Sequence, residues 1–436
     1  MGCSPSTPEV APEPLENESG ETTMDLNTSG KAGYRPSIIS LQIPNEMTDD
    51  LSSENMSDRS GDDPREPSEY LYGTDVTLDW LLQKIGDSLG KTLDEEPQWI
   101  TERLNRPSWD VDYATSSVVR VTFGWDDESL PKSVVLKTPV AKDQREDEEA
   151  KYHYLMFKRE CNVYEWTSKF PKLPAPGIIH IKKHSKEGSG VVVMEDVSEK
   201  GVDQDPVKGL TVEVVKDLLK HLAFLHATSL KHPTWTTLVA DLPPSYYAHI
   251  TANYNSTMDF FERHDVEHSR FVETGKYFSD EYLFSTATET CDQLGIPRVL
   301  IHGEPYAPNI FTKAEKNHQV VSSIIDWTES HSGCFAEDIA KSICWNLSAK
   351  DRIENTEALL ESYYESLSSQ YEKECPITLE TVQKAYEIFV PFAMVSLCEK
   401  VMSMKNKTEC EPLIDRAKSL IQQMYTLAKV EAAKES

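Results

Sequence analysis

The sequence predicts an α+β fold with two lobes, a small strand-rich first lobe and a larger helical second lobe, preceded by a polar tail. At 436 residues the chain is longer than one hydrophobic core usually serves. Short segments rich in β-branched residues dominate the first half of the folded body, and long amphipathic segments dominate the second half. We therefore divide the chain into a tail at 1–68, a first lobe at 69–196 and a second lobe at 197–436.

The tail is predicted to be disordered. Between Met1 and Glu66 it carries 14 acidic and 4 basic residues, a net charge of −10, and it has few aromatic residues. Such a segment buries too little apolar surface to offset the entropy lost on ordering. Its apolar stretch, Ile38–Ile43, leaves two interpretations open: docking on the folded body or a partner, or continuous disorder.

The first residues match a lipidation pattern. Gly2 and Ser6 fit the N-myristoylation signal, and Cys3 is the natural site for a palmitoyl chain. One acyl chain gives only marginal membrane residence and the tail has no basic cluster, so stable anchoring would need both chains. The pattern predicts peripheral membrane association through acylated Gly2 and Cys3. The other interpretation is a soluble tail with a chance match.

Charge and composition exclude several classes of function. The net charge of −29 disfavours nucleic acid and other polyanionic partners, and no apolar run approaches the roughly 20 residues of a membrane-spanning helix. The eight cysteines are scattered, without a C-x-x-C pair and without a signal peptide ahead of them. We therefore expect reduced thiols in a cytoplasmic protein.

The elements of the two lobes follow from hydrophobic periodicity. In the first lobe we expect a hairpin of two strands, then a helix, then a third strand: Ser117–Phe123, Ser133–Thr138, Lys151–Phe170 and Gly190–Met194. In the second lobe Thr211 is a good N-cap for a long helix. Three further helices and three short strands follow it: Ile353–Leu367, Leu379–Met404, Pro412–Val430, Val299–Ile301, Asn309–Thr312 and Val320–Ile325.

Candidate functional side chains flank the short strands of the second lobe. Glu304 and Asn309 lie on a loop between apolar strands, and Asp326 follows the buried strand that ends at Ile325. A buried carboxylate without a partner is costly, and Mg2+ carrying nucleotide phosphates would supply both charge and coordination for Asp326. The amide oxygen of Asn309 suits the same ion, and Glu304 is placed to face an acceptor hydroxyl.

The first lobe supplies a matching cation. Lys137 ends a run of three apolar strand residues, and Glu160 on the following helix is its natural partner. Either signal alone is usually a solvated surface charge. Strand lysine, helix glutamate, hinge strand, loop asparagine and strand-end aspartate, however, come in the serial order of a kinase fold. The order therefore predicts a site for ATP and Mg2+.

Seven motifs resemble those of the CHK kinase-like proteins, which belong with ecdysteroid-kinase-like enzymes, choline/ethanolamine kinases and aminoglycoside phosphotransferases. They are Val134–Lys137, Phe157–Glu160, Val193–Asp196, Leu222–Ala227, His302–Asn309, Ile324–Trp327 and Ala336–Asp338. The resemblance extends from about Tyr70 to the C-terminus. It implies a bilobal protein-kinase-like fold that transfers the γ-phosphate of ATP to a small-molecule hydroxyl.

The resemblance also implies residue roles. Lys137 and Glu160 would form the ion pair that positions the phosphates, and Asn309 with Asp326 would hold the magnesium ion. Backbone groups of Glu195, Asp196 and Val197 would contact the adenine. Asp338 and His302 would brace the catalytic loop rather than take part in chemistry.

Two departures from the family pattern leave two functions open. Glu304 stands where the family's H-G-D motif has its aspartate, and a displacement of about 1 Å can cost on the order of 100-fold in rate. The phosphate-loop segment Asp110–Ser117 has no glycine, although Ser116 and Ser117 can still donate hydrogen bonds. One function is a small-molecule kinase. The alternative is a catalytically inactive kinase-like binding or regulatory module.

The acceptor is the least defined part of the sequence interpretation. Trp235, Trp327 and Trp345 either line a pocket for a cationic amino alcohol or pack in the core, and the core is the more frequent place for such residues. A sterol-like hydroxyl is equally compatible with the sequence.

Overall fold

The structure is a computed structural model. It describes residues 70–71, 74–93, 96–104, 116–139, 148–185, 189–239, 241–372, 375–404 and 409–435. The predicted tail at 1–68, with Gly2, Cys3 and Ile38–Ile43, lies outside these ranges, as does Asp110–Thr115 of the phosphate-loop segment. None of the helices within the described ranges combines the length and apolar character needed to span a bilayer. The seven cysteines in these ranges are free thiols.

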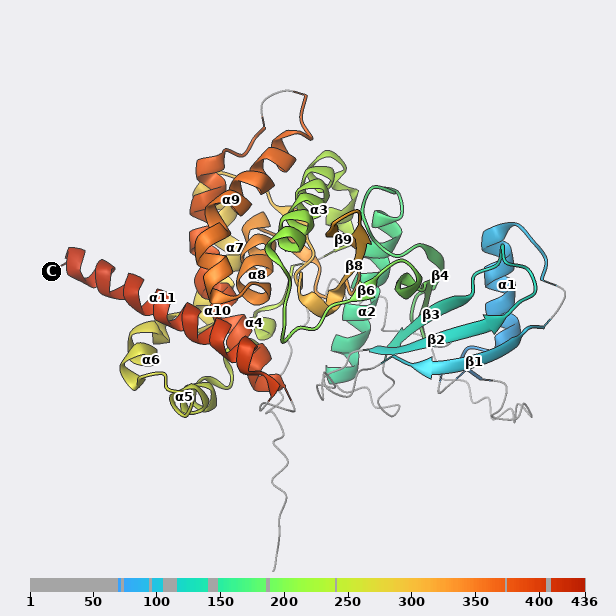
Figure 1. Cartoon of the computed structure of the whole chain (residues 1–436), viewed down its shortest axis with the longest axis horizontal. Helices are drawn as coiled ribbons and strands as arrows, with labels where there is room; N and C mark the ends of the chain where they lie inside the picture. The colour runs from blue at the N-terminus through green and yellow to red at the C-terminus, as the bar shows by residue number, and fades with distance from the viewer. Residues whose placement is uncertain are drawn as a thin grey trace, which may run out of the picture. The chain divides into compact units, whose positions relative to one another are not determined.

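The first lobe is built on an antiparallel sheet with the strand order β1-β2-β3-β5-β4 (Figure 1). Its strands are β1 (Gln98–Arg103), β2 (Ser116–Gly124), β3 (Ser133–Pro139), β4 (Ile178–Lys182) and β5 (Val191–Glu195). Two helices accompany them, α1 (Leu78–Leu89) and α2 (Glu148–Thr167). The predicted hairpin is confirmed, because β2 and β3 pair in register with Val118 opposite Lys137. The sequence interpretation did not include α1, β1 or β4.

Helix α1 covers one face of this sheet. Thr77 caps its first turn by accepting a hydrogen bond from the backbone N–H of Trp80, and Gly90 ends it in the left-handed conformation. Its buried residues join Val134 and Leu136 of β3 in a small hydrophobic cluster. Val135 belongs to the large core of the chain instead, together with buried residues of α2. The sheet thus separates two cores, as the alternation of side chains along a strand requires.

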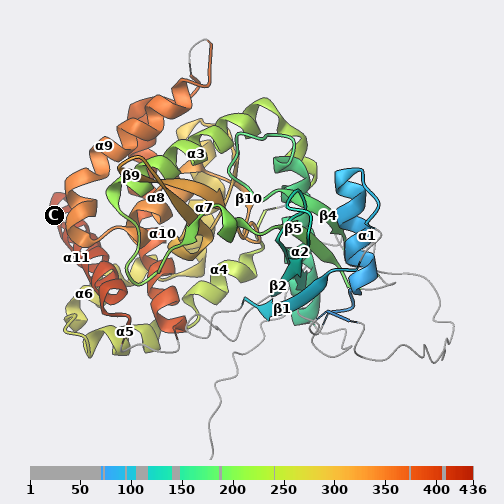
Figure 2. The same ribbon diagram turned by 45° about the vertical axis from the view of Figure 1, so that its right-hand side comes forward.

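The second lobe is mainly helical. Its helices are α3 (Val212–Lys231), α4 (Pro244–Thr251), α5 (Tyr254–Glu262), α6 (His268–Thr274), α7 (Asp280–Leu294), α8 (Phe335–Asn346), α9 (Ala349–Ser368), α10 (Leu379–Ser403) and α11 (Glu411–Glu435). Two small sheets complete it, β6-β8-β9 and β10-β7. Their strands are β6 (Val202–Asp203), β7 (Val299–Ile301), β8 (Ile310–Glu315), β9 (His318–Ile324) and β10 (His331–Gly333). Figure 2 shows β9 beside α3 in the second lobe.

The predicted elements of this lobe are confirmed. Thr211 caps α3 by accepting a hydrogen bond from the backbone N–H of Val214, as its position before the apolar stripe predicted. The three later helices and three short strands appear within a few residues of their predicted bounds. With a small antiparallel sheet in the first lobe and a helical second lobe, the chain has the predicted bilobal protein-kinase-like α+β fold.

Candidate active site

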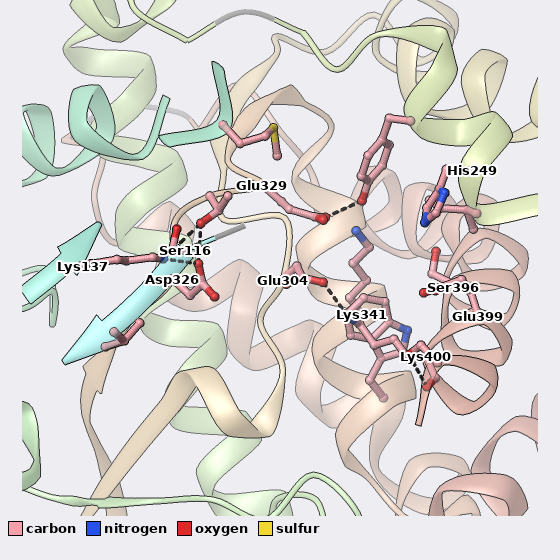
Figure 3. A pocket seen from close by; sticks show the side chains of 17 residues that line it. Ser116, Lys137, His249, Glu304, Asp326, Glu329, Lys341, Ser396, Glu399 and Lys400 are labelled. Atoms are coloured by element: carbon pink, nitrogen blue, oxygen red, sulfur yellow. Dashed lines mark hydrogen bonds and ion pairs between the residues drawn. The ribbon is translucent and has the colours of Figure 1, made fainter. Parts of the chain in front are cut away.

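Side chains of both lobes line a cavity of about 350 Å3 (Figure 3). At one end lie Ser116 of β2, Lys137 of β3 and Asp326, which follows β9. At the other end lie Glu304 of the loop after β7 and residues of α4, α8 and α10. The volume falls in the range of small-molecule sites. The cavity therefore joins the predicted nucleotide end to the predicted acceptor end.

Lys137 is the centre of a buried charged network. Its Nζ lies 2.8 Å from Oε1 of Glu160 and 2.8 Å from Oδ1 of Asp326, and it donates a hydrogen bond of 3.2 Å to the Thr328 hydroxyl. Glu160 is fully buried, and the Lys137 side chain is 8% exposed. The Asp326 side chain is 40% exposed and faces the cavity. Residues from three separate segments of the sequence, at 137, 160 and 326–328, thus meet at one ammonium group.

The surroundings of the two carboxyl groups in this network shift their pKa values in opposite directions. Burial raises the pKa of Glu160, and the attraction of Lys137 offsets this only in part. Burial would also raise the pKa of Asp326, but the charge of Lys137 and hydrogen bonds from Lys137 and Thr328 lower it to about 2. The pKa of Lys137 is raised, because the two carboxylates outweigh the effect of its burial. Asp326 is therefore ionised at neutral pH.

The backbone of Asn309 is bonded to the residue before Asp326, although Asn309 is not among the residues that line the cavity. The backbone N–H of Ile325 donates a 2.9 Å hydrogen bond to the carbonyl oxygen of Asn309, and Ile310 pairs with Ile324 in the adjoining strands. The Asn309 side chain donates from Nδ2 to the carbonyl of Glu304 at 3.1 Å, which leaves Oδ1 as its acceptor atom. Asp326 itself has a left-handed backbone with φ of 62°. A positive φ is uncommon for residues other than glycine, and such strain is often retained at functional sites.

The loop at 302–309 is held in place by Asp338 of α8. This fully buried carboxylate accepts hydrogen bonds from the backbone N–H groups of His302, at 2.7 Å, and Gly303, at 2.9 Å, and it lies 3.2 Å from Nε2 of His226. The predicted bracing role of Asp338 is confirmed. Lys341 adds a further support, since its Nζ donates to the Gly303 carbonyl at 2.7 Å.

His302 supports the same loop. Its Nδ1 accepts from the backbone N–H of Glu304 at 3.1 Å, so the other ring nitrogen, Nε2, donates to the carbonyl of Ile325 at 3.0 Å. Burial lowers the pKa of His302, which favours this neutral form. Between the two residues Gly303 has φ of 88°, and a Cβ there would lie 2.4 Å from the carbonyl oxygen of Glu329. The loop fits closely enough that only glycine is accommodated at this position.

Glu304, which stands at the position of the family aspartate, forms an ion pair with Lys400 of α10. Its Oε1 lies 2.5 Å from Nζ of Lys400, and both side chains are about four-fifths buried. The sequence interpretation did not identify Lys400. A basic residue near the C-terminal end of a helix is ordinarily explained by the helix dipole.

A second carboxyl group without a predicted role, Glu329, lies in the same cavity. The Tyr246 hydroxyl of α4 donates a hydrogen bond to its Oε2 (Figure 3). Burial and the negative charge of Glu304 raise the pKa of Glu329 to about 8, although Lys341 and Lys400 act in the opposite direction. Glu329 therefore holds a proton at neutral pH.

Because Glu329 is protonated more readily in the folded chain, we expect the free energy of unfolding to depend on pH. The folded-state pKa of Glu329 exceeds the unfolded value, so its contribution is complete below about pH 4.5 and is lost as the pH rises through about 8. Between these limits the free energy of unfolding should fall with a slope of up to about 1.4 kcal/mol per pH unit from this group. We expect Glu329→Gln to remove this slope in urea unfolding at pH 6, 7, 8 and 9. An unchanged slope in the variant would assign the titration to another group.

The remaining predicted residues are placed as follows. Ser116 lines the cavity, whereas Ser117 is not among its lining residues. The Glu195 side chain accepts from the backbone N–H of Gly177 at 3.1 Å. Asp196 pairs with Arg120 at 2.6 Å and caps the short 3-10 helix at Val197–Glu199. Glu195, Asp196 and Val197 are not among the lining residues either, so their backbone contact with adenine stays a prediction.

The three tryptophans divide between the core and the cavity. Trp235, Trp327 and Trp345 are all about 1% exposed, and of these only Trp345 lines the cavity. The core interpretation therefore applies to Trp235 and Trp327.

The sequence interpretation did not identify Thr328, which contacts both Lys137 and Asp326. Its place two residues after Asp326 was a usable signal.

The residues present fit a magnesium ion carried by a nucleotide. Among the described residues there is no group of three or more His, Cys, Asp and Glu side chains that could hold a metal by itself. Magnesium usually takes only one or two side chains and completes its shell with phosphate and water oxygens. The ionised Asp326 and the neighbouring Asn309 would supply such a pair, and the ion would neutralise phosphate charge.

Fold and site together define a protein-kinase-like chain. A buried strand lysine paired with a helix glutamate, and a braced loop followed by a strand-end aspartate, are structural parts of that class. The chain belongs to the DUF1679 family, described as "Uncharacterized oxidoreductase dhs-27", which matches residues 66–432.

Two curated relatives come from Caenorhabditis elegans. "Uncharacterized kinase-like protein D1044.1" is 25% identical over 230 residues, which cover 51% of this chain and 59% of that protein. "Uncharacterized oxidoreductase dhs-27" is 22% identical over 359 residues, which cover 74% of this chain and 43% of that protein. The chain thus spans less than two thirds of either relative. The predicted kinase-like resemblance is confirmed.

Similar solved structures include a choline kinase and a putative aminoglycoside phosphotransferase. The choline kinase of Cryptosporidium parvum Iowa II has a TM-score of 0.47 and 12% identity, with 77% of this chain and 90% of that chain covered. A putative aminoglycoside phosphotransferase of Ralstonia eutropha has a TM-score of 0.45 and 11% identity, with 79% and 97% covered.

Proposed function

We propose that this chain is a phosphotransferase that uses ATP and Mg2+ to phosphorylate a hydroxyl group of a small metabolite. One observation carries the proposal: the ammonium of Lys137, held by the buried Glu160, meets the ionised Asp326 at one end of a cavity. This is the charge arrangement that phosphoryl transfer uses to position a nucleotide.

Ser116 supports a phosphate-binding role for the same end. It is 8% exposed, and its hydroxyl has no hydrogen-bond partner among the residues that the structure describes. Buried polar groups are nearly always paired, so an unpaired hydroxyl in a cavity favours a ligand with acceptor oxygens. Nucleotide phosphates supply such oxygens next to the Lys137 ammonium.

The acceptor would bind at the Glu304 end of the cavity. In the proposed reaction its hydroxyl oxygen attacks the γ-phosphorus, and the bond to the β–γ bridging oxygen breaks to release ADP. The hydroxyl proton passes to the carboxylate of Glu304. Most catalysis in such transfers comes from positioning and charge stabilisation, so an imperfectly placed base lowers the rate without abolishing it.

The second candidate function is a binding or regulatory module that holds a nucleotide without transferring phosphate. The ion pair between Glu304 and Lys400 favours it, because the carboxylate that would accept the proton is already bound to an ammonium group. This candidate shares the nucleotide end of the cavity with the first.

Thermal unfolding with ATP and Mg2+ tests the nucleotide site that both candidates share. A ligand at about 100 times its dissociation constant should stabilise the folded chain by about 2.7 kcal/mol. We expect Asp326→Ala to lose this stabilisation and Asp292→Ala, an exposed aspartate of α7, to keep it. The absence of any ATP-dependent shift in the natural sequence would contradict both candidates.

Phosphate transfer from ATP to pooled alcohols then separates the candidates. We expect ADP and a phosphorylated alcohol to accumulate with the natural sequence, and only background with Asp326→Ala. Nucleotide binding combined with transfer at the Asp326→Ala background would establish the binding module instead.

A further inference from the structure

The ammonium group of Lys400 lies over two aromatic rings. Its Nζ is 4.9 Å from the ring centre of Trp345 and 5.3 Å from that of Tyr306. Both distances are within the approximately 6 Å of a cation–π interaction. The side chain is 18% exposed, so the cation is largely removed from water, where such contacts are strongest.

Carboxyl groups complete the surroundings of this ammonium. Glu304 contacts it at 2.5 Å, and Glu329 and Glu399 line the same cavity. Although burial lowers the pKa of Lys400, Glu304, Glu329 and Glu399 together raise it, so these groups act on the same cation. We call Glu304, Tyr306, Glu329, Trp345 and Glu399 the ammonium cage.

Aromatic rings around a cation are the surroundings that proteins use to bind ammonium ligands, and here the Glu304 carboxylate adds a negative charge. Here the bound cation is a side chain of the chain itself, delivered by α10 to the acceptor end of the cavity (Figure 3). A second cation at the same place would meet like charge in a partly desolvated setting, which costs several kcal/mol in typical cases.

We propose that Lys400 is a specificity-determining residue: by filling the ammonium cage it excludes positively charged acceptors and restricts the site to uncharged hydroxyl compounds. The restriction on acceptors rests on the proposed function, whereas the filled cage does not. Specificity of this kind comes from a repulsive element built into the site.

Four further groups at this end of the cavity agree with an uncharged acceptor, and His249 lines it as well. Tyr246, Ile250, Ser396 and Ser403 offer neutral and apolar surface. The second ammonium group, that of Lys341, contacts the Gly303 carbonyl and the buried carboxylate of Glu337, each at 2.7 Å. This ammonium group also lies 5.2 Å from the ring centre of Trp345, so it adds a second fixed positive charge beside the cage.

Vacating the cage tests the proposal. Lys400→Ala removes the ammonium with most of its stem, and propylammonium chloride is a probe of matching size and charge. We expect saturable thermal stabilisation of Lys400→Ala by propylammonium, half-maximal at a concentration at least about tenfold lower than any effect on the natural sequence, since tenfold corresponds to only about 1.4 kcal/mol. Propan-1-ol and sodium chloride control for the alkyl group and for ionic strength.

A matched variant controls for the loss of a lysine over an aromatic ring. Lys429 of α11 lies 5.6 Å from the ring centre of Tyr425 and pairs with Glu273, but its side chain is 50% exposed. We expect Lys429→Ala to show no saturable response to propylammonium. A response of Lys400→Ala no greater than that of Lys429→Ala would overturn the proposal.

The natural sequence supplies a test that does not depend on the variant folding. Tetramethylammonium should give no saturable heat in isothermal titration calorimetry, because Lys400 occupies the cage. Saturable binding would show that the cage accepts an external cation and would refute the exclusion. Neither measurement uses a nucleotide, so failure here leaves the ATP result standing, and failure of the ATP test leaves the cage result standing.

Discussion

Replacing Lys137 by methionine is expected to lower the free energy of unfolding by about 3–5 kcal/mol and to reduce phosphate transfer by at least about 100-fold. Methionine keeps much of the volume but removes the cation, which leaves the fully buried Glu160 and the adjacent Asp326 without their shared partner. Urea unfolding followed by tryptophan fluorescence measures the first effect. Transfer from ATP at a temperature where both proteins remain folded measures the second.

The chain offers a matched control in a lysine that pairs with another glutamate of α2, the helix of Glu160. Lys183 pairs with Glu165 of α2 at 2.9 Å, but the two side chains are 40% and 43% exposed. Exposed pairs contribute about 0–1 kcal/mol, so Lys183→Met should change stability little and transfer not at all. If Lys137→Met were no more destabilising than Lys183→Met, the buried network would not be a stabilising element. Adding Glu160→Gln to Lys137→Met should recover part of the lost stability, because the second change removes the unpaired buried carboxylate.

The second large effect is expected for Asp338→Ala. The change removes a fully buried carboxylate that accepts hydrogen bonds from the backbone N–H groups of His302 and Gly303 and lies against His226. Leaving buried donors unpaired should cost about 3–5 kcal/mol in total. Urea unfolding measures this loss, and transfer from ATP should also fall because the loop that carries Glu304 is no longer braced.

Asp292→Ala provides the comparison for an exposed aspartate. Surface substitutions of this kind usually change the free energy of unfolding by no more than about 0.5 kcal/mol. A similar small effect of Asp338→Ala would mean that Lys341 and His302 hold the loop unaided.

The elements that the sequence predicted correctly are those with a local signal. Thr211 precedes an apolar stripe of helical spacing, and the strands around Lys137 are continuous runs of apolar residues. Helix α1 had such a signal in Leu78, Leu81 and Ile85 and could have been predicted. Strand β1 could not, because it is an edge strand whose mostly exposed residues show no clear apolar alternation.

The residues of the candidate site also divide into those with a signal in the sequence and those without one. Lys137, Glu160 and Asp326 could be chosen because their serial order is informative, and the structure brings them together. Lys400 meets Glu304 across 96 residues of sequence, and no local pattern distinguishes it from any basic residue near a helix end. The proton held by Glu329 depends on burial and on charges from three other segments, which a sequence does not display.

The position of the Lys137 ammonium group depends on how side chains alternate along β3. Val134 and Leu136 face the small cluster beneath α1, and Val135 faces the large core. Lys137 therefore lies on the same side as Val135, where it contacts Glu160. A shift of the β3 register by one residue would turn the ammonium group toward α1 and leave Glu160 without its partner. The register of the hairpin thus decides which side of the sheet carries the ammonium group.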